Sequence, residues 1–313
     1  MRTYPLPGSL LGLFPLFFCA SLITSGCATT VERPRTEDAA RLLAPLPACL
    51  MQLSSRGGKA GSSGVAVALR EEQYWKLVYP GFDATRSALP ANARTCTGTS
   101  VLDDPSLAGG EPLHAKVEEG DAVIAGGSDR LRIIWLRSSR FEDGTMGGTL
   151  ALVRGYEASA EVYAVGPFRG RPTKSRFSLE RIGAEVVVVA QDDGCTGRAP
   201  GAACETSLSV LLPRQGSLRR IATTAIERVA YLENSEPGVH GRVEYRLAST
   251  PQFFTGGIRV LEQVVVRDSL GRVIREAELD RSYALMPDDS MVVSDESIWS
   301  RLIRPTKPAE KNE

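Results

Sequence analysis

Two adjacent carboxylates, Asp192 and Asp193, are candidates for acidic chemistry. Gly194 and a cysteine follow them directly. Carboxylate oxygens ligate Ca²⁺, and two acidic side chains can act as acid and base in glycoside hydrolysis. The segment lacks the D-x-D-x-D-G-x₅-E spacing of a calcium loop. The residues therefore predict a solvated turn, with calcium-dependent adhesion and hydrolysis of glycan or peptide as alternatives.

Other catalytic signatures are absent from the full sequence. It contains two histidines, His114 and His240, and no H-E-x-x-H, G-x-S-x-G or S-x-x-K segment. The glycine-rich stretch 54–64 lacks the Gly-Lys-Ser/Thr ending of a phosphate-binding loop, because Ala60 follows Lys59. We therefore assign no catalytic residue, no metal and no cofactor, and expect a protein that is not an enzyme.

One short segment concentrates positive charge. Residues 168–176, "FRGRPTKSR", contain four basic side chains: Arg169, Arg171, Lys174 and Arg176. Such a segment can contact an anionic glycan, a lipid headgroup or a partner protein, and a charged connection between strands has the same composition. We therefore consider these four residues candidate contacts for an anion or a partner.

The N-terminus has the pattern of an export signal. Arg2 precedes an apolar run at residues 10–23, which is shorter than the roughly 20 residues of a membrane-spanning helix. Small residues then lead to a cysteine in Thr24-Ser25-Gly26-Cys27. This segment resembles the lipobox of bacterial lipoproteins. The resemblance implies that residues 1–26 are removed and that Cys27 carries the covalent lipid.

The same resemblance implies a location. Cys27 would attach the chain to a membrane through its acyl groups, and several acyl chains make a stable anchor. Ala28 follows the cysteine, where an aspartate would resemble the inner-membrane retention signal of Gram-negative lipoproteins. The resemblance therefore implies an exported protein that is anchored in the cell envelope, at the outer membrane. Residues 27–47 would be the lipidated N-terminus and tether, with a short helix after Thr36.

Four cysteines remain after Cys19, which leaves with the signal, and Cys27: Cys49, Cys96, Cys195 and Cys204. An even number in an exported chain predicts disulfides, and three connectivities are possible. Cys195 and Cys204 flank a Gly/Ala/Pro-rich segment between two strand-like runs, so the spacing favours a bond between them. Cys49 would then pair with Cys96. Neither pair has the C-x₂-C spacing typical of zinc.

Short apolar runs with alternating side chains and frequent glycines predict antiparallel strands over much of the chain. The predicted strands are residues 65–70, 74–79, 131–137, 149–156, 160–165, 176–182, 185–191, 206–212, 218–223, 241–248, 257–268 and 271–280. Gly271 provides the tight turn between the last two. Residues 222–233 fit a helix or a strand, and residues 295–303 predict a short helix capped by Ser294.

These elements predict a mainly β fold of antiparallel sheets, as a sandwich, an open barrel or a partial propeller, with short helices near both ends. The globular domain would span 48–303, with irregular stretches at 80–115 and 166–175, of which 166–175 is a possible sub-boundary. Residues 304–313 read as a disordered tail.

The net charge of the chain limits the classes of partner that it could bind. The 37 basic and 37 acidic side chains cancel, whereas nucleic-acid binders carry an excess of positive charge. We therefore expect no nucleic-acid partner. The sequence favours a lipid-anchored envelope lipoprotein, a non-enzymatic binding or scaffold module for an envelope protein or glycan. An extracytoplasmic hydrolase is the alternative.

Overall fold

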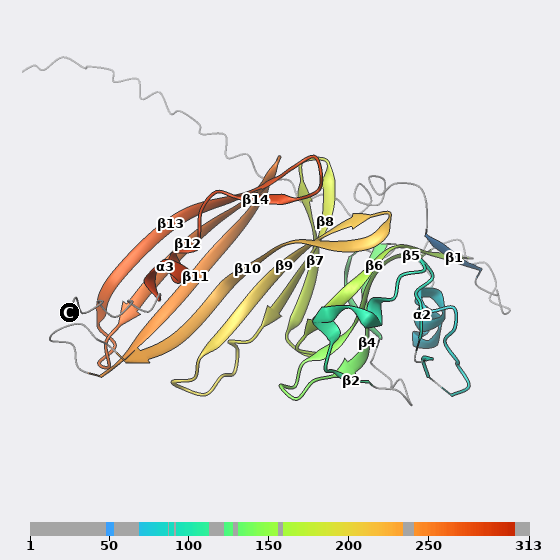
Figure 1. The fold of residues 1–313 in the computed structure, drawn as a ribbon, viewed down its shortest axis with the longest axis horizontal. Helices are drawn as coiled ribbons and strands as arrows, with labels where there is room; N and C mark the ends of the chain where they lie inside the picture. The colour runs from blue at the N-terminus through green and yellow to red at the C-terminus, as the bar shows by residue number, and fades with distance from the viewer. Residues whose placement is uncertain are drawn as a thin grey trace, which may run out of the picture. The chain divides into compact units, whose positions relative to one another are not determined.

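The structure is a computed structural model that describes the following stretches of the chain: 48–52, 69–86, 88–90, 92–112, 122–127, 131–155, 159–233 and 241–303. All of these residues belong to one compact unit. Strands dominate this unit, so the prediction of a mainly β fold is confirmed (Figure 1). The predicted signal peptide, the tether with its short helix, and the tail 304–313 lie outside the described residues.

The described strands are β1 (Cys49–Gln52), β2 (Glu111–Pro112), β3 (Ala122–Gly127), β4 (Leu131–Arg140), β5 (Met146–Gly155), β6 (Ser159–Gly170), β7 (Ser175–Ile182), β8 (Glu185–Asp193), β9 (Cys204–Arg214), β10 (Gly216–Glu233), β11 (Arg242–Phe254), β12 (Gly257–Arg267), β13 (Val273–Leu285) and β14 (Met291–Val293). The described helices are α2 (Glu71–Val78), α3 (Ile298–Leu302) and two 3₁₀ turns, η1 (Val101–Asp103) and η2 (Pro105–Leu107).

The strands form two groups within one sheet. Strands β7 to β14 make a meander in which each strand pairs antiparallel with the next. Strands β4, β5 and β6 pair antiparallel, with β1 beside β6 and both β2 and β3 beside β4. The groups join where Gly216 and Ser217 of β10 run parallel to β6. The order of the described strands begins at β14 and ends at β2, so the sheet is open.

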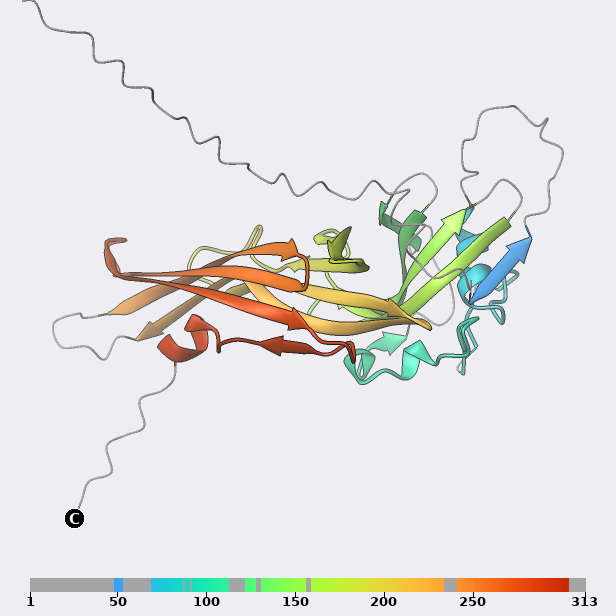
Figure 2. The same ribbon diagram turned by 90° about the horizontal axis from the view of Figure 1, so that it is seen from above.

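Alternation along the strands explains how the sheet forms its core. In β12, Ile258 and Val260 are buried, whereas Arg259 between them and Leu261 after them are exposed. Successive side chains of a strand point to opposite faces, so one face of β12 is apolar. This face packs against β8 and β9 at one end and against α3 at the other. Figure 2 shows α3 on one side of the long strands.

The predicted strand at 74–79 is wrong, because residues 74–78 belong to helix α2 and Tyr79 follows as its C-cap. Its aromatic and β-branched residues suggested a strand, but they recur at helical spacing. Four apolar residues of α2 are buried: Tyr74, Trp75, Leu77 and Val78. Glu72 and Lys76 on the exposed side form an i,i+4 ion pair at 2.8 Å, which supports the helix. Of the predicted strand at 65–70, only Leu69 and Arg70 are described, and they are not in a strand.

The short helix near the C-terminus is confirmed, but its predicted cap is wrong. The side chain that caps α3 is Ser297, whose Oγ accepts a hydrogen bond from the Trp299 amide at 3.3 Å. Ser294 continues the pairing with β13 instead, since its amide donates to the Ser282 carbonyl at 2.9 Å. The helix therefore starts one turn later than the sequence suggested.

Both disulfides favoured by the cysteine spacing are present. The Cα atoms of Cys49 and Cys96 are 5.8 Å apart, and those of Cys195 and Cys204 are 5.0 Å apart. The first bond joins β1 to the irregular segment after α2, and the second closes the turn between β8 and β9. Two such bonds fit an extracytoplasmic location, where thiols oxidise.

Two further segments resolve as strands. Residues 222–233, which fitted either a helix or a strand, lie in β10. Residues 166–170, predicted as irregular, form the end of β6, so only the turn at 171–174 separates β6 from β7. The remaining predicted strands from residue 131 onward are confirmed, with Gly271 at φ 78° in the turn between β12 and β13.

Candidate functional site

The four basic residues predicted as contacts lie at the end of β6, in the turn after it and on β7. Arg169, at the end of β6, is held over the turn between β4 and β5. Its Nε donates to Thr145 Oγ1 and its Nη2 pairs with Asp143, both at 2.8 Å. The guanidinium also lies 3.6 Å from the ring centre of Phe141, as in a cation–π contact. The Arg169 guanidinium is therefore fixed by three neighbours.

Arg171 is fixed in a similar way by a different carboxylate. Its backbone amide donates to Asp192 at 2.6 Å, and its Nη1 pairs with the other oxygen of Asp192 at 2.5 Å. The Ser175 hydroxyl donates to the same carboxylate at 3.1 Å. Asp192, expected to be solvated, thus ties together the turn between β6 and β7.

The other two basic residues have different side-chain partners, although the Lys174 amide donates to the Arg171 carbonyl at 3.1 Å. Lys174 Nζ donates to the Thr196 carbonyl of the disulfide-closed turn at 2.5 Å. Arg176 is exposed on β7, and neither Lys174 nor Arg176 is among the residues that line the hollow containing Arg169 and Arg171. The four cations are close in sequence, and the fold brings two of them, Arg169 and Arg171, to a common hollow.

That hollow, which we call the arginine pocket, has a volume of about 350 Å³ and is lined by Arg169, Arg171 and a third arginine, Arg220 of β10. Hydroxyl side chains provide much of the remaining lining: Ser106, Thr145, Ser207, Ser209 and Thr223. Two acidic residues, Asp143 and Asp192, also line it. Three arginines against two aspartates leave the lining with one excess positive charge.

Arg220 was not recognised as a site residue in the sequence. It is exposed, and within the described part of the chain no hydrogen bond or ion pair engages it. The register with β9 shifts between Arg220 and Ala222, and such a bulge re-aims the side chains beside it. Since 49 positions separate it from Arg171, only strand register could reveal that they share a pocket.

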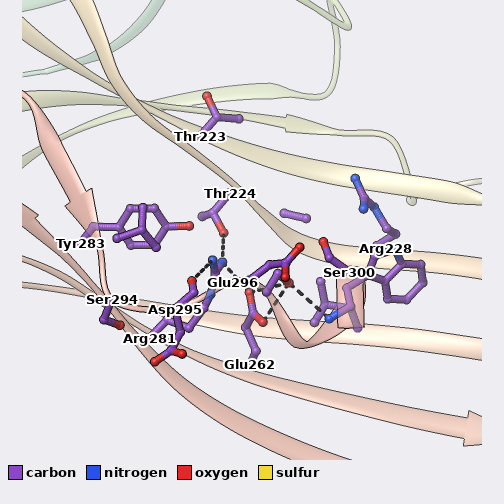
Figure 3. Close-up of a pocket in the computed structure, with 15 residues that line it drawn as sticks. Thr223, Thr224, Arg228, Glu262, Arg281, Tyr283, Ser294, Asp295, Glu296 and Ser300 are labelled. Carbon is purple, nitrogen blue, oxygen red and sulfur yellow. Dashed lines mark hydrogen bonds and ion pairs between the residues drawn. The ribbon is translucent and has the colours of Figure 1, made fainter. Parts of the chain in front are cut away.

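A second hollow, the inner pocket, has a volume of about 540 Å³ and lies between β10, β12, β13 and the segment before α3 (Figure 3). Glu262 and Arg281 meet in it at 2.5 Å, and their side chains are only 1% and 7% exposed. Glu262 occupies an inward position of β12 between Val260 and Val264. A glutamate within an otherwise apolar inward row is the signal by which the sequence could have revealed this pair.

Glu262 has further partners that belong to helix α3. Its carboxylate accepts hydrogen bonds from the Ser297 hydroxyl, at 2.9 and 3.0 Å, and from the Ile298 amide at 2.9 Å. Arg281 also donates to the Asp295 carbonyl at 3.3 Å and lies 3.4 Å from Thr224 Oγ1. We call this ion pair and its hydrogen-bond partners the Glu262–Arg281 clasp. The clasp attaches the C-terminal segment to the face of the sheet on which Glu262 lies.

Asp193 accepts hydrogen bonds within the turn between β8 and β9. Its carboxylate accepts from the Cys195 and Thr196 amides at 2.9 Å each and from the Thr206 hydroxyl at 3.0 Å. Burial raises the pKa of Asp193, but the hydrogen bonds from Thr196, Cys195 and Thr206 outweigh it and hold that pKa at about 2. A general acid needs a raised pKa, so this carboxylate is tuned in the opposite direction. Asp192 and Asp193 thus act as turn-forming acceptors here.

Comparisons with known protein families, curated proteins and solved structures give no match to this chain. Among the described residues, no three His, Cys, Asp or Glu side chains gather as metal ligands would. In the same part of the chain, no helix has the length and apolarity needed to cross a membrane.

Proposed function

We propose that this chain is a lipid-anchored protein of the cell envelope whose β unit is a non-catalytic binding module. The observation that carries the proposal is the engagement of three of the carboxylates that line the two pockets. Arginine engages Glu262 in the inner pocket, and Asp143 and Asp192 in the arginine pocket. These carboxylates are engaged in ion pairs within the fold, whereas the arginines that hold Asp143 and Asp192 retain N–H donors for a ligand.

The anchor in this proposal is Cys27, which would carry the acyl groups at the outer membrane. Its support is the lipobox-like Thr24-Ser25-Gly26-Cys27 segment together with the two disulfides, which fit an oxidising compartment. The segment that precedes β1 would then tether the β unit near the membrane surface, within reach of an envelope protein or glycan.

Labelling with a fatty-acid probe in the producing cell tests this anchor. The wild-type protein should take up the label and sediment with membranes, and Cys27→Ala should lose the label because no thiol remains at the acylation site. Cys19→Ala is the matched control, since it removes a cysteine of the same region without touching the lipobox. Full labelling of Cys27→Ala would contradict the proposal.

A further inference from the structure

We propose that the arginine pocket is a binding site for a phosphate ester, held by Arg220 together with Arg169 and Arg171. This inference deepens the proposed function, because it names the class of ligand that the binding module takes. It concerns a site formed by β6, β8, β9, β10 and the turn between β4 and β5.

The arginine pocket contains hydrogen-bond donors that the described part of the protein does not itself use. A guanidinium carries five N–H groups. Arg169 uses Nε and Nη2, and Arg171 uses Nη1, so Nη1 of Arg169 and both Nε and Nη2 of Arg171 make no hydrogen bond within the described residues. Arg220 contributes its whole guanidinium. The pocket therefore offers more donors than its own carboxylates accept.

Two of the three arginines are held in place by other side chains. Asp143 and Phe141 hold Arg169 in place, and Asp192 holds Arg171. Arginine side chains normally lose much rotamer freedom when they bind a ligand, and prior fixing reduces that cost. Two of the three guanidinium groups are thus already positioned before a ligand arrives, and Arg220 is the one that must close on it.

Hydroxyl groups in the rest of the lining suit the same ligand. The Ser207 hydroxyl is half-buried and makes no hydrogen bond within the part of the chain that the structure describes. Ser209 and Thr223 place two more hydroxyls side by side, 3.4 Å apart, on neighbouring strands. Three arginines and several hydroxyls match the oxygens of a phosphoryl group and the hydroxyls of a polyol that carries it.

The charge of the inner pocket suits an anion less well than the charge of the arginine pocket. Its lining carries Arg228 and Arg281 against Glu262, Asp295 and Glu296, so acidic groups outnumber basic ones by three to two. Its buried arginine is also neutralised at 2.5 Å by a buried glutamate. An anion would meet repulsion there, whereas the arginine pocket has an excess positive charge.

Calorimetric titration of the full lipidated protein, held in phosphatidylcholine nanodiscs, tests the inference with inorganic phosphate and glycerol 3-phosphate as probes. We expect one saturable site with a Kd tighter than about 1 mM. Arg220→Gln should weaken binding roughly 10-fold or more, because it removes charge-assisted hydrogen bonds. Arg176→Gln is the matched control, since it removes the same charge from an exposed position outside the pocket, and it should change the Kd less than about twofold.

Three results would overturn the inference: no saturable binding of either probe, equal weakening by both variants, or acetate binding as tightly as phosphate. Unchanged thermal melting of Arg220→Gln would show that the fold is intact. Nanodiscs with phosphatidylglycerol separate the ligand sources, because an anionic headgroup would compete and weaken glycerol 3-phosphate binding in wild type but not in Arg220→Gln. A free phosphate ester as ligand predicts no such competition. Loss of labelling at Cys27 concerns the anchor alone, because the same titration of the full protein without lipid, in solution, still tests the pocket.

Discussion

Arginine and carboxylate side chains meet in two regions of this molecule, with opposite consequences. In the Glu262–Arg281 clasp both partners are almost fully buried, and the carboxylate also accepts hydrogen bonds from Ser297 and Ile298. In the arginine pocket the Arg169–Asp143 pair is 35% and 55% exposed, and Arg220 has no acidic partner among the described residues. The first region holds the fold together, and the second keeps donors available.

Burial explains this difference. Removing two charges from water is expensive, and a buried ion pair is tolerated only when each partner is satisfied by the other and by further hydrogen bonds. An exposed pair contributes little stability, because water already solvates both groups. The same residue types can therefore serve as a structural fastening on an inner face and as a ligand site at a solvated hollow.

The largest expected effect comes from breaking the clasp. Arg281→Ala leaves Glu262 as an uncompensated charge in a buried position, so the free energy of unfolding should fall by about 3–5 kcal/mol. Arg169→Ala, the matched change in an exposed pair, should cost about 0–1 kcal/mol. Chemical denaturation measures both values, and equal losses would contradict the distinction between the two regions.

A smaller effect is expected from the disulfide nearest the arginine pocket. Replacing both Cys195 and Cys204 by serine should lower the free energy of unfolding by about 2.7 kcal/mol, from the entropy of the short loop that the bond closes. Asp193, which caps this turn, adjoins Asp192, so phosphate binding should weaken as well. Limited proteolysis should show faster cleavage within this turn while α3 stays protected. Cleavage at α3 instead would imply that the two regions are coupled.

The smallest effect concerns the pH dependence of the same turn. The pKa of Asp193 is about 2 in the folded protein, below the value of about 3.9 for an unfolded chain. Its carboxylate therefore stabilises the fold above pH 4, and this contribution is lost as the pH falls from 4 to 2. Asp193→Asn should be less stable than wild type at pH 6, with a difference that shrinks over that range. Melting temperatures measured from pH 6 to pH 2 check this, and a constant difference would refute it.

The sequence predicted most strands because alternation records which side of a sheet each residue faces. β12 illustrates this with Ile258 and Val260 inward and Arg259 outward. The same reasoning failed at 74–79, where closely spaced apolar residues fit both periods and the helix was decided by packing against β4, β5 and β6. The disulfide pairing was predictable because spacing alone limits which cysteines a short turn can join.

The candidate sites were less predictable, because they depend on register. Arg169 and Arg171 were recognised through their local density of charge, whereas Arg220 joins them only through the pairing of β9 with β10 and its bulge. Glu262 and Arg281 lie on neighbouring strands with ordinary charged surroundings in the sequence. Their contact can be inferred only once it is known which side chains of the two strands point inward.

The most direct test of the account is the comparison of Arg220→Gln with Arg176→Gln in phosphate titrations of the nanodisc-held protein. The account predicts that wild type and Arg176→Gln bind glycerol 3-phosphate with similar Kd values, and that Arg220→Gln binds it at least roughly 10-fold more weakly with an unchanged melting temperature. Equal affinities for all three proteins would contradict the claim that the arginine pocket is built to hold an anion.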